Sequence, residues 1–572
     1  MATKNREIAQ IFKSIGEILE LKGDSSFRVN SYYKASRVIG DLSQDIEKVA
    51  AEGKLRDISG IGEATAKKIE EYLETGRIGR YEELKKDIPA DLIRMMEIPG
   101  LGPKTVNLLW QKLGVTTMTD LRRVMRSGQA AELPGMGEKK VQNILKGIEL
   151  YSVARERMPL GVALPIAQEI AGNLRKLKGV KAAEPAGSLR RKCETIGDID
   201  ILTSGTDGAG IIKAFTELSQ VKRVLAAGDT KGSVILEGDF QIDVRVVPEK
   251  SFGAALQYFT GSKAHNIRLR GLAKTKGLKV SEYGVFKGKK SIAGKDEEEV
   301  YEALGLPWMP PELREDRGEI AAAQQGRLPD LIELEDIKGD LQVHSTYSDG
   351  SNSIEEMALA AKKRGYKYIC ITDHSRSLKV ASGLEIEELE ERAEEIARLN
   401  KKLKGIRILN GAEVDILGDG RLDYPDEVLE KLDIVLGAIH SALGQEEKKM
   451  TARLLSAIEN PNVDIIAHPT GRVFGQRGPS NIDLERIMKA AAETKTVLEI
   501  DAYYDRLDLN DINARMARDM GVKLEISTDA HHIDQLWMME LGVAVARRGW
   551  LTSADVINTL PADKLLKWIR SK

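Results

Sequence analysis

Along residues 1–150, apolar positions recur every three or four residues, which is the spacing of amphipathic helices. A short phrase occurs three times here, each time before such a pattern: Ile58-Ser-Gly-Ile-Gly62, Ile98-Pro-Gly-Leu-Gly102 and Leu133-Pro-Gly-Met-Gly137. Paired glycines allow a tight turn, and the backbone N–H groups of the helix that follows then face outward. The repeat therefore predicts three helix–hairpin–helix units in a mostly helical N-terminal region.

A turn of this kind can bind a phosphate without touching a base. The simpler alternative is a glycine turn between two packed helices. Three copies, in a stretch with 25 Lys+Arg against 22 Asp+Glu, favour contact with the DNA backbone. We expect these contacts at six glycines: Gly60, Gly62, Gly100, Gly102, Gly135 and Gly137.

In residues 151–318, polar and apolar positions alternate in two segments, as in half-buried strands. Asp198 and Asp200 lead into one strand and share one of its faces, and Asp243 lies in a second, Phe240–Val247. Three carboxylates that meet on a sheet can hold two Mg²⁺ ions about 3.5–4 Å apart. Acids that cap strand ends at the surface are the alternative.

A phosphate-binding segment precedes the first of these strands. Gly187-Ser188 stands before a predicted helix or turn and is followed by Arg190 and Arg191. Backbone N–H groups and guanidinium groups placed together in this way can bind a nucleoside triphosphate. This segment and the downstream Asp243 favour a nucleotidyl-transfer site over surface caps.

Residues 339–572 alternate short apolar strands with helical patterns, which predicts βα units and a barrel-like parallel sheet. Polar residues recur at the C-terminal ends of the strands, where barrel enzymes place their sites. These residues are His344, Asp349, His374, Glu413, His440, His468, Asp529 and His531. Imidazoles and carboxylates without thiolates suit two or three Zn²⁺ or Mn²⁺ ions in a hydrolytic site.

Composition and charge indicate the number of domains and the compartment of the protein. A chain of 572 residues predicts several domains, and two cysteines exclude a disulfide framework or a thiolate zinc cluster. No apolar run approaches about 18 residues, and the N-terminus is too polar for a signal peptide. Residues 1–318 carry a net charge of +8 and the remainder −10, which indicates two functions on one chain. We expect a cytoplasmic, nucleoid-associated monomer with no membrane partner.

The motifs of residues 1–318 resemble those of family X DNA polymerases of the DNA polymerase beta type. The resemblance rests on Gly187-Ser-x-Arg-Arg…Gly197-Asp-x-Asp200 and on Tyr258-Phe-Thr-Gly-Ser262. It implies Asp198, Asp200 and Asp243 as ligands of two Mg²⁺ or Mn²⁺ ions. It also implies a nucleotide site built from Gly187, Ser188, Arg191, Gly197, Tyr258, Phe259, Gly261, Asn266 and Arg270.

The N-terminal region resembles the lyase domain of the same family. Phe27-Arg-Val-Asn-Ser-Tyr-Tyr-Lys34 is similar to its 5′-phosphate pocket, with Arg28 and Tyr32 as DNA contacts. The lyase nucleophile corresponds to Lys68, whose amine could form a Schiff base with a sugar aldehyde. A solvated, phosphate-binding lysine is the alternative. Arg28 stands where the beta enzyme has lysine, and the hairpin at 133–137 is additional to its two.

Residues 339–572 resemble the polymerase-and-histidinol-phosphatase (PHP) domain. The motifs are His344-Ser-Thr-Tyr-Ser-Asp-Gly350, Thr372-Asp-His374, Gly-Ala-Glu413, Ile439-His-Ser441, Ala467-His-Pro469 and Thr528-Asp-Ala-His531. The family opens with His-x-His, whereas this chain has Gln342 at the first position. The order of polymerase and PHP parts is that of bacterial and archaeal family X polymerases.

Together these patterns predict a multidomain fold: a helical helix–hairpin–helix region, an α+β palm and thumb, and a distorted (β/α) PHP barrel. The expected boundaries are 1–85 lyase-like, 86–150 fingers, 151–248 palm, 249–318 thumb, 319–338 linker and 339–572 PHP. The expected activity is gap filling on primed or gapped DNA with deoxynucleoside triphosphates in base excision repair, with 3′-5′ exonuclease or 3′-end phosphoesterase activity in the PHP domain. The alternative is a polymerase whose PHP domain is inactive and structural.

Overall fold

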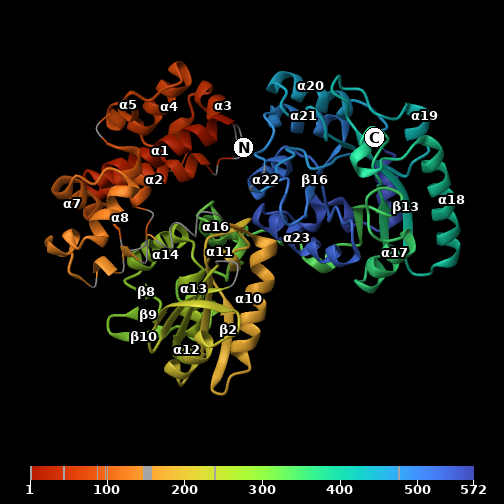
Figure 1. Cartoon of the computed structure of the whole chain (residues 1–572). Coiled ribbons are helices and arrows are strands. Elements are labelled where there is room, and N and C mark those ends of the chain that lie inside the picture. The colour runs from red at the N-terminus through yellow and green to blue at the C-terminus, as the bar shows by residue number, and fades with distance from the viewer. Residues whose placement is uncertain are drawn as a thin grey trace. The chain divides into compact units, whose positions relative to one another are not determined.

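The computed structural model describes residues 3–40, 42, 46–58, 60–86, 88–96, 98, 101–138, 140–142, 144–145, 148, 157–236, 240–474 and 477–571. The chain divides into two compact units, which are described separately (Figure 1). The first comprises Met1–Arg157, Thr216–Ala227 and Gly232–Ile242. The second comprises Met158–Phe215, Gly228–Lys231 and Asp243–Lys572.

The described part of residues 1–150 in the first unit is mainly helical, as the apolar spacing predicts, and is red to orange in Figure 1. Its helices are α1 (Thr3–Leu21), α2 (Ser26–Gly40), α3 (Ile46–Ala51), α4 (Glu63–Thr75), α5 (Gly79–Lys86), α6 (Ala90–Met95), α7 (Pro103–Leu113) and α8 (Met118–Arg126). Ile8, Phe12 and Ile15 lie three or four residues apart on α1 and are fully buried. The stripe that they form packs in one apolar core with residues from the other helices.

The three repeated phrases form turns with the same backbone hydrogen bond. The N–H groups of Ile61, Leu101 and Met136 donate to the carbonyls three residues earlier, at 3.0, 2.9 and 3.0 Å. Gly60 and Gly135 have φ of +107° and +74°, which requires glycine. Gly62 and Gly102 are the N-caps of α4 and α7 and supply no capping side chain. Gly100 lies outside the described residues.

The second unit begins with the palm. Its elements are β1 (Met158–Pro159), α10 (Leu160–Arg175), β2 (Val180–Pro185), α11 (Gly187–Arg190), β3 (Thr195–Ile196), β4 (Ile199–Gly205), α12 (Gly208–Thr216) and β7 (Gln241–Val247). Strands β2, β4 and β7 are successive neighbours in one sheet, and β2 and β4 are antiparallel. The hairpin of β5 (Val221–Ala227) and β6 (Lys231–Leu236) is also antiparallel. On β7, Ile242, Val244 and Val246 are buried, so Asp243 lies on the other face of that strand.

The thumb follows the palm. It contains α13 (Phe252–Thr260), α14 (Lys263–Thr275), α15 (Glu297–Glu302), α16 (Glu319–Gln324) and a sheet of β8 (Lys279–Ser281), β9 (Gly284–Lys287) and β10 (Lys290–Ala293). His265 is fully buried and lies 2.6 Å from Glu319 through Nδ1 and 3.0 Å from the Tyr301 hydroxyl through Nε2. These bonds satisfy polar groups that would be costly to bury alone.

Residues 319–338, the expected connector, are themselves packed. Ile320 and Ala323 of α16 belong to the apolar core of the thumb. Leu331 packs with Leu313 and Trp550, and so joins residues from both sides of the segment. This stretch is an integral part of the second unit rather than an exposed tether.

Within the described residues after 338, the barrel has seven parallel strands in sequence order. They are β11 (Gly339–Val343), β12 (Tyr368–Ile371), β13 (Arg407–Asp415), β14 (Ile434–Ala438), β15 (Ile465–Ile466), β16 (Val497–Asp501) and β17 (Leu524–Ser527). The helices between and after them are α17 (Ile354–Lys363), α18 (Ile386–Lys402), α19 (Asp426–Leu429), α20 (Glu447–Ile458), α21 (Leu484–Thr494), α22 (Asp511–Asp519), α23 (Met539–Arg548) and α24 (Ala562–Ile569). A parallel bridge between Val343 and Ala530 brings the first and last strands together, so the strand ends converge.

None of the helices that the structure describes is both long enough and apolar enough to cross a membrane.

Candidate active sites

The palm places its three predicted aspartates around the start of β4 and the middle of β7. Asp198 precedes β4, Asp200 lies within it, and Asp243 is on β7. Burial, together with the charges of Asp198 and Asp243, raises the pKa of Asp200 to about 7. Three like charges that interact this strongly favour a bound cation, which would neutralise them and return Asp200 to its ionised form.

Gly187 allows the phosphate-binding segment to approach Asp200. Its φ is +59°, and a Cβ built on it would lie 2.3 Å from Asp200 Oδ2. The neighbouring Ala186 N–H donates to the Asp200 carbonyl at 2.8 Å. The first turn of α11, with Ser188, is thereby fixed beside a carboxylate that is a predicted metal ligand. This close approach is the physical reason for glycine at this position.

Lys231 pairs with Asp243 at 2.9 Å between Nζ and Oδ2. Within the described part of the chain, the sets of ligand atoms that lie within 4.8 Å of one another all come from the barrel, and the three palm aspartates do not form such a set. The Lys231 ammonium offers Asp243 a positive charge, which a bound cation would also supply.

Sequence reasoning missed Lys231 and also Arg245. The Arg245 guanidinium lies 4.6 Å from the centre of the Phe259 ring, and its charge opposes the raised pKa of Asp200. Arg245 stands two residues after Asp243 on β7, so strand alternation could have placed it on the same face. No sequence signal marks Lys231.

Arg191, in the palm, is held by two groups of the thumb. Its Nε donates to Glu315 Oε1 at 2.9 Å, and its Nη1 donates to the Thr260 carbonyl at 2.6 Å. Gly261 has a φ of +72°, and a Cβ there would lie 3.2 Å from Arg191 Nη1. The Tyr-Phe-Thr-Gly-Ser segment and the Gly-Ser-x-Arg-Arg segment therefore meet through this side chain.

The other predicted nucleotide-site residues lie along α13 and α14. Asn266 is buried, and its Nδ2 donates to the Tyr258 carbonyl at 2.7 Å. Arg270 Nε donates to the Asn266 carbonyl at 3.3 Å, and the Tyr258 and Phe259 rings meet edge to face at 5.2 Å. Gly197 is exposed beside Asp198. The two motifs of the resemblance are thus on adjoining elements of one domain.

Lys68 lies one turn into α4. Its Nζ donates to the Ala64 carbonyl at 3.0 Å and stands 5.8 Å from the centre of the Tyr32 ring. Arg28 is exposed and pairs with Asp24 at 3.0 Å, and Phe27 at the start of α2 is 85 % exposed. The structure therefore brings Lys68 and Tyr32 together, as the predicted lyase site requires.

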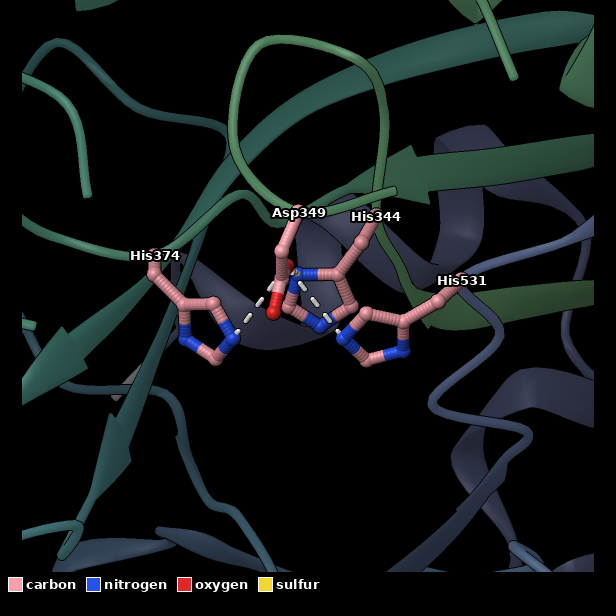
Figure 2. Close-up of side chains that lie close together, drawn as sticks. All are labelled: His344, Asp349, His374 and His531. Atoms are coloured by element: carbon pink, nitrogen blue, oxygen red, sulfur yellow. Dashed lines mark ion pairs between the residues drawn. The ribbon is translucent and has the colours of Figure 1, made fainter. Parts of the chain in front are cut away.

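The barrel gathers all eight predicted ligands at one end. Seven of them form three overlapping sets whose ligand atoms lie within 4.8 Å: His344, Asp349, His374 and His531; His374, Glu413 and His440; and His344, Glu413 and Asp529. The eighth, His468, lies beside Glu413. Figure 2 shows the first set, with Asp349 among the three imidazoles. Asp349 Oδ1 lies 3.4 Å from His531 Nε2, 3.6 Å from His374 Nε2 and 3.9 Å from His344 Nδ1.

Glu413 is the carboxylate that two of these sets share. Its Oε2 lies 2.9 Å from His374 Nδ1, and its Oε1 lies 2.9 Å from His468 Nε2 and 3.3 Å from His440 Nε2. Asp529 Oδ1 lies 3.0 Å from His344 Nε2. Residues more than 180 positions apart in sequence therefore meet only in the folded barrel.

Carboxylates oppose the effect of burial at two imidazoles of the barrel site. Burial disfavours charge at His440, but Glu413 and Asp415 raise its pKa to about 10. Burial likewise opposes charge at His531, whose pKa Asp349 and Asp529 raise to about 9. A metal ion would compete with protons for these imidazoles, so metal binding should depend on pH.

The residues present fit metal ions, because imidazole and carboxylate ligand atoms lie close together in a buried cluster. His344 Nδ1 is buried without a hydrogen-bond partner, and His374 Nδ1 and Glu413 Oε2 lie 2.9 Å apart. Unpaired buried polar atoms are rare unless a ligand takes them up. Gln342 differs: its Nε2 donates to Asp529 Oδ1 at 3.2 Å, and its Oε1 is buried without a partner.

Sequence reasoning also missed the residues behind the ligands. Asp415 Oδ1 lies 2.9 Å from His440 Nδ1, and Arg506 Nε lies 3.9 Å from Asp529 Oδ2. Asp415 stands two residues after Glu413 on β13, so alternation along the strand could have revealed it. Arg506 lies in the loop after β16 and has no such signal.

Four families match parts of the chain. They are a helix–hairpin–helix domain at residues 3–78, a SAM-like helix–hairpin–helix tandem at 91–149, a DNA polymerase beta thumb at 255–315 and a PHP domain at 340–504. The DNA polymerase/3′-5′ exonuclease PolX of Bacillus subtilis (strain 168) is 41% identical over 557 residues, which cover 97% of each chain. The chain belongs to the family X DNA polymerases that carry a PHP domain.

Two further relatives of this family X chain are each similar to a part of it. DNA polymerase lambda of Rattus norvegicus is 28% identical over 341 residues, 54% of this chain and 56% of its own. A probable phosphatase of Thermoanaerobacter sp. (strain X514) is 30% identical over 244 residues, 41% of this chain and 94% of its own. The predicted family and fold class are confirmed. The roles of individual residues and the six domain boundaries stay predictions.

Proposed function

We propose that this chain is a template-directed DNA polymerase that fills short gaps in DNA repair, of the base excision type. We also propose that its PHP barrel hydrolyses phosphoesters at DNA 3′ ends, as a 3′-5′ exonuclease or 3′-end phosphoesterase. Two observations support the proposal. The chain has two separate groups of carboxylates, one in the palm and one in the barrel, and it is 41% identical to a protein named as both polymerase and exonuclease. The proposed substrates are gapped or primed DNA and deoxynucleoside triphosphates.

In the polymerase site, Asp198, Asp200 and Asp243 would hold two Mg²⁺ or Mn²⁺ ions. Bound cations there would activate a primer 3′-hydroxyl and neutralise charge on the triphosphate. Ser188 and the first turn of α11 would bind phosphate oxygens through backbone and hydroxyl groups. Arg191 would donate to the triphosphate from its guanidinium group. The orientation of this group is fixed, because its Nε is bound to Glu315 and its Nη1 to the Thr260 carbonyl.

The base-pair end of the site would be formed by the thumb. Tyr258 and Phe259 would pack beneath the sugar and base of the incoming nucleotide. Asn266 and Arg270, both on α14, would contact the base pair in the minor groove. The buried hydrogen bond from Asn266 to the Tyr258 carbonyl would orient these groups together.

In the barrel, the three overlapping sets would hold two or three Zn²⁺ or Mn²⁺ ions. Bound cations there would polarise the phosphoester and lower the pKa of water toward neutrality. Glu413 would link two ion positions, and Asp349 would face the position bounded by three imidazoles. Arg506, close to Asp529, would balance the negative charge of the carboxylates and the bound phosphate.

The N-terminal unit would hold DNA through its three hairpins. Backbone N–H groups at the uncapped starts of α4 and α7 are suited to phosphates on either side of a gap. Lys68 would act as a 5′-deoxyribose-phosphate lyase nucleophile, with Tyr32 beside it. We propose the boundaries 1–85, 86–150, 151–248, 249–318, 319–338 and 339–572 for the lyase-like, fingers, palm, thumb, linker and PHP parts, in a monomer of the nucleoid.

A one-nucleotide gapped duplex tests the proposal. With nucleotides and Mg²⁺, the primer should extend by one residue, and with Mn²⁺ alone it should shorten from its 3′ end. A 3′-phosphate primer separates the two hydrolytic activities, because an end phosphoesterase would remove the phosphate and leave the primer length unchanged. Primer left unaltered under both conditions would reject the assignment of both centres.

A structural PHP domain is the second candidate, and Gln342 is the observation that favours it. Glutamine is a poor ligand, and it stands where the family has histidine. The buried Nδ1 of His344, which has no hydrogen-bond partner, and the retained cluster of imidazoles and carboxylates oppose it. The metal content of the purified full chain decides between the two candidates.

A further inference from the structure

Arg548, in the last turn of α23 in the PHP barrel, reaches a predicted nucleotide ligand of the polymerase. Its side chain is 6 % exposed. Its Nη1 donates to the Arg191 carbonyl at 2.7 Å and to Glu315 Oε1 at 3.0 Å. Its Nη2 lies 2.9 Å from Asp511 Oδ2 at the start of α22. One guanidinium thus connects the barrel with two groups of the polymerase part.

The same carboxylate oxygen of Glu315 accepts from both arginines. Arg191 Nε donates to Glu315 Oε1 at 2.9 Å, and Arg548 donates to it at 3.0 Å. Arg548 therefore fixes Arg191 twice, once through its backbone carbonyl and once through the carboxylate that holds its side chain. With Nε on Glu315 and Nη1 on the Thr260 carbonyl, the plane of the Arg191 guanidinium is determined.

Arginines and carboxylates alternate through this cluster, so each charged group lies beside a group of opposite charge. Asp511 also accepts from Arg317 Nη1 at 2.7 Å, so it lies between two arginines. Burial opposes the ionisation of Glu315, but Arg548, Arg191 and Arg317 lower its pKa to about 2. Loss of the Arg548 guanidinium would leave Glu315 with Arg191 and Asp511 with Arg317, and these buried partners would rearrange.

The neighbouring residue, Arg547, provides an internal comparison. It also joins the barrel to the thumb, through Nε to Glu312 at 2.8 Å and through Nη1 to the Ile332 carbonyl at 3.0 Å. Its side chain is 14 % exposed, and that of Glu312 is 12 % exposed. These contacts are as well formed as those of Arg548, but they involve neither Arg191 nor Glu315. Arg547 thus attaches the barrel to the thumb without contact to Arg191, whereas Arg548 attaches the barrel and also holds Arg191.

We propose that Arg548 of the PHP barrel is a positioning residue of the polymerase site, which holds Arg191 in the orientation that binds the triphosphate. This rests on the proposed role of Arg191. The barrel is then a structural component of the nucleotide pocket in addition to its own hydrolytic site. Arg548 touches neither nucleotide nor metal in this role, because it acts through Glu315 and the Arg191 backbone.

Single-nucleotide incorporation on the gapped duplex tests the inference in the full-length chain. Arg548→Met should raise the KM for the nucleotide about tenfold with a smaller change in kcat, because ground-state triphosphate binding is what it disturbs. Arg548→Lys retains the charge and one donor, so its KM should lie between those of the parent and Arg548→Met. Arg547→Met, the matched control, should change KM less than about twofold.

A double-mutant cycle with Arg191→Met separates the two assignments. If Arg191→Met leaves KM unchanged, the proposed role of Arg191 is wrong. If Arg191→Met raises KM and Arg548→Met adds nothing further to it, the inference holds. If the two effects multiply, or if Arg548→Met and Arg547→Met act alike, Arg548 only attaches the barrel and the inference is overturned. Should Arg548→Met fail to fold, Arg548→Lys takes its place in the same cycle.

Discussion

The Nδ1 atom of His440 lies 2.9 Å from Oδ1 of Asp415, a carboxylate that stands behind the imidazole and outside the three ligand sets. Ser377 Oγ donates to the other Asp415 oxygen at 2.7 Å, which fixes the carboxylate in turn. The pair leaves His440 Nε2 directed toward Glu413, at 3.3 Å from Oε1. Asp415 therefore sets the ring orientation and tautomer with which His440 would meet a metal.

Asp415→Asn should weaken metal binding without removing a ligand. Loss of the carboxylate charge behind an imidazole ligand lowers affinity roughly 10–100-fold. Titration of the metal-free full chain with Mn²⁺ measures this. Asp419→Asn, at an exposed aspartate in the loop that follows β13, should bind like the parent. Equal affinity in Asp415→Asn and the parent would mean that His440 is oriented by other groups or is not a ligand.

Gln342→His should reduce the dependence of the nuclease on added Mn²⁺. In the parent, the Gln342 amide donates to Asp529 and offers only a weak oxygen ligand, so one metal position is under-liganded. An imidazole there is a far better ligand for Mn²⁺ or Zn²⁺. The measurement is 3′ hydrolysis against Mn²⁺ concentration, with half-maximal activity expected at lower Mn²⁺ in the variant. A shift to higher Mn²⁺ would contradict the account.

Lys68→Ala should lower borohydride trapping on a 5′-deoxyribose-phosphate end. Trapping requires a Schiff base between a lysine amine and the sugar aldehyde, and Lys68 lies beside Tyr32 in the proposed pocket. Lys67→Ala is the matched control, because Lys67 is on the same helix and pairs with Glu63 at 3.2 Å. Trapping that stays at the parental level in Lys68→Ala would move the lyase function to another lysine or remove it.

The ionised Glu315 should stabilise the second unit in a pH-dependent way. Its pKa is about 2 in the folded chain against an ordinary value of 4.5. A depressed carboxyl pKa stabilises the fold above the unfolded pKa, by about 3 kcal/mol here, and that stability is lost as pH falls toward the folded pKa. The difference in Tm between the parent and Glu315→Gln should therefore shrink from pH 5 to pH 3. A constant difference would mean that Glu315 is not held as an anion.

Much of the fold was predictable because its signals are local. Apolar spacing marks the N-terminal helices, Gly-x-Gly phrases mark the hairpins, and polar residues at strand ends mark the ligands of the barrel. Asp415 and Arg245 could have been added by strand alternation, since each stands two residues after a predicted ligand. Lys231, Arg506 and Arg548 could not, because each meets its partner only in the folded chain and no local pattern marks the pair.

A local sequence pattern also could not predict that residues 319–338 are packed. The segment has the composition of a connector, yet Ile320 and Ala323 complete the thumb core. Whether a short apolar helix is buried depends on the surface that it meets, which periodicity does not reveal.

One assay can show whether nucleotide incorporation takes place in the palm and 3′ hydrolysis takes place separately in the barrel. The gapped duplex, labelled on the primer, is incubated with the parent, Asp243→Ala and His440→Ala, with and without nucleotides. Asp243→Ala should lose incorporation and keep 3′ hydrolysis, because it removes a ligand from the palm alone. His440→Ala should keep gap filling and lose both 3′ hydrolysis and bound metal. Full-length extension by Asp243→Ala, or undiminished 3′ hydrolysis by His440→Ala, would contradict the account.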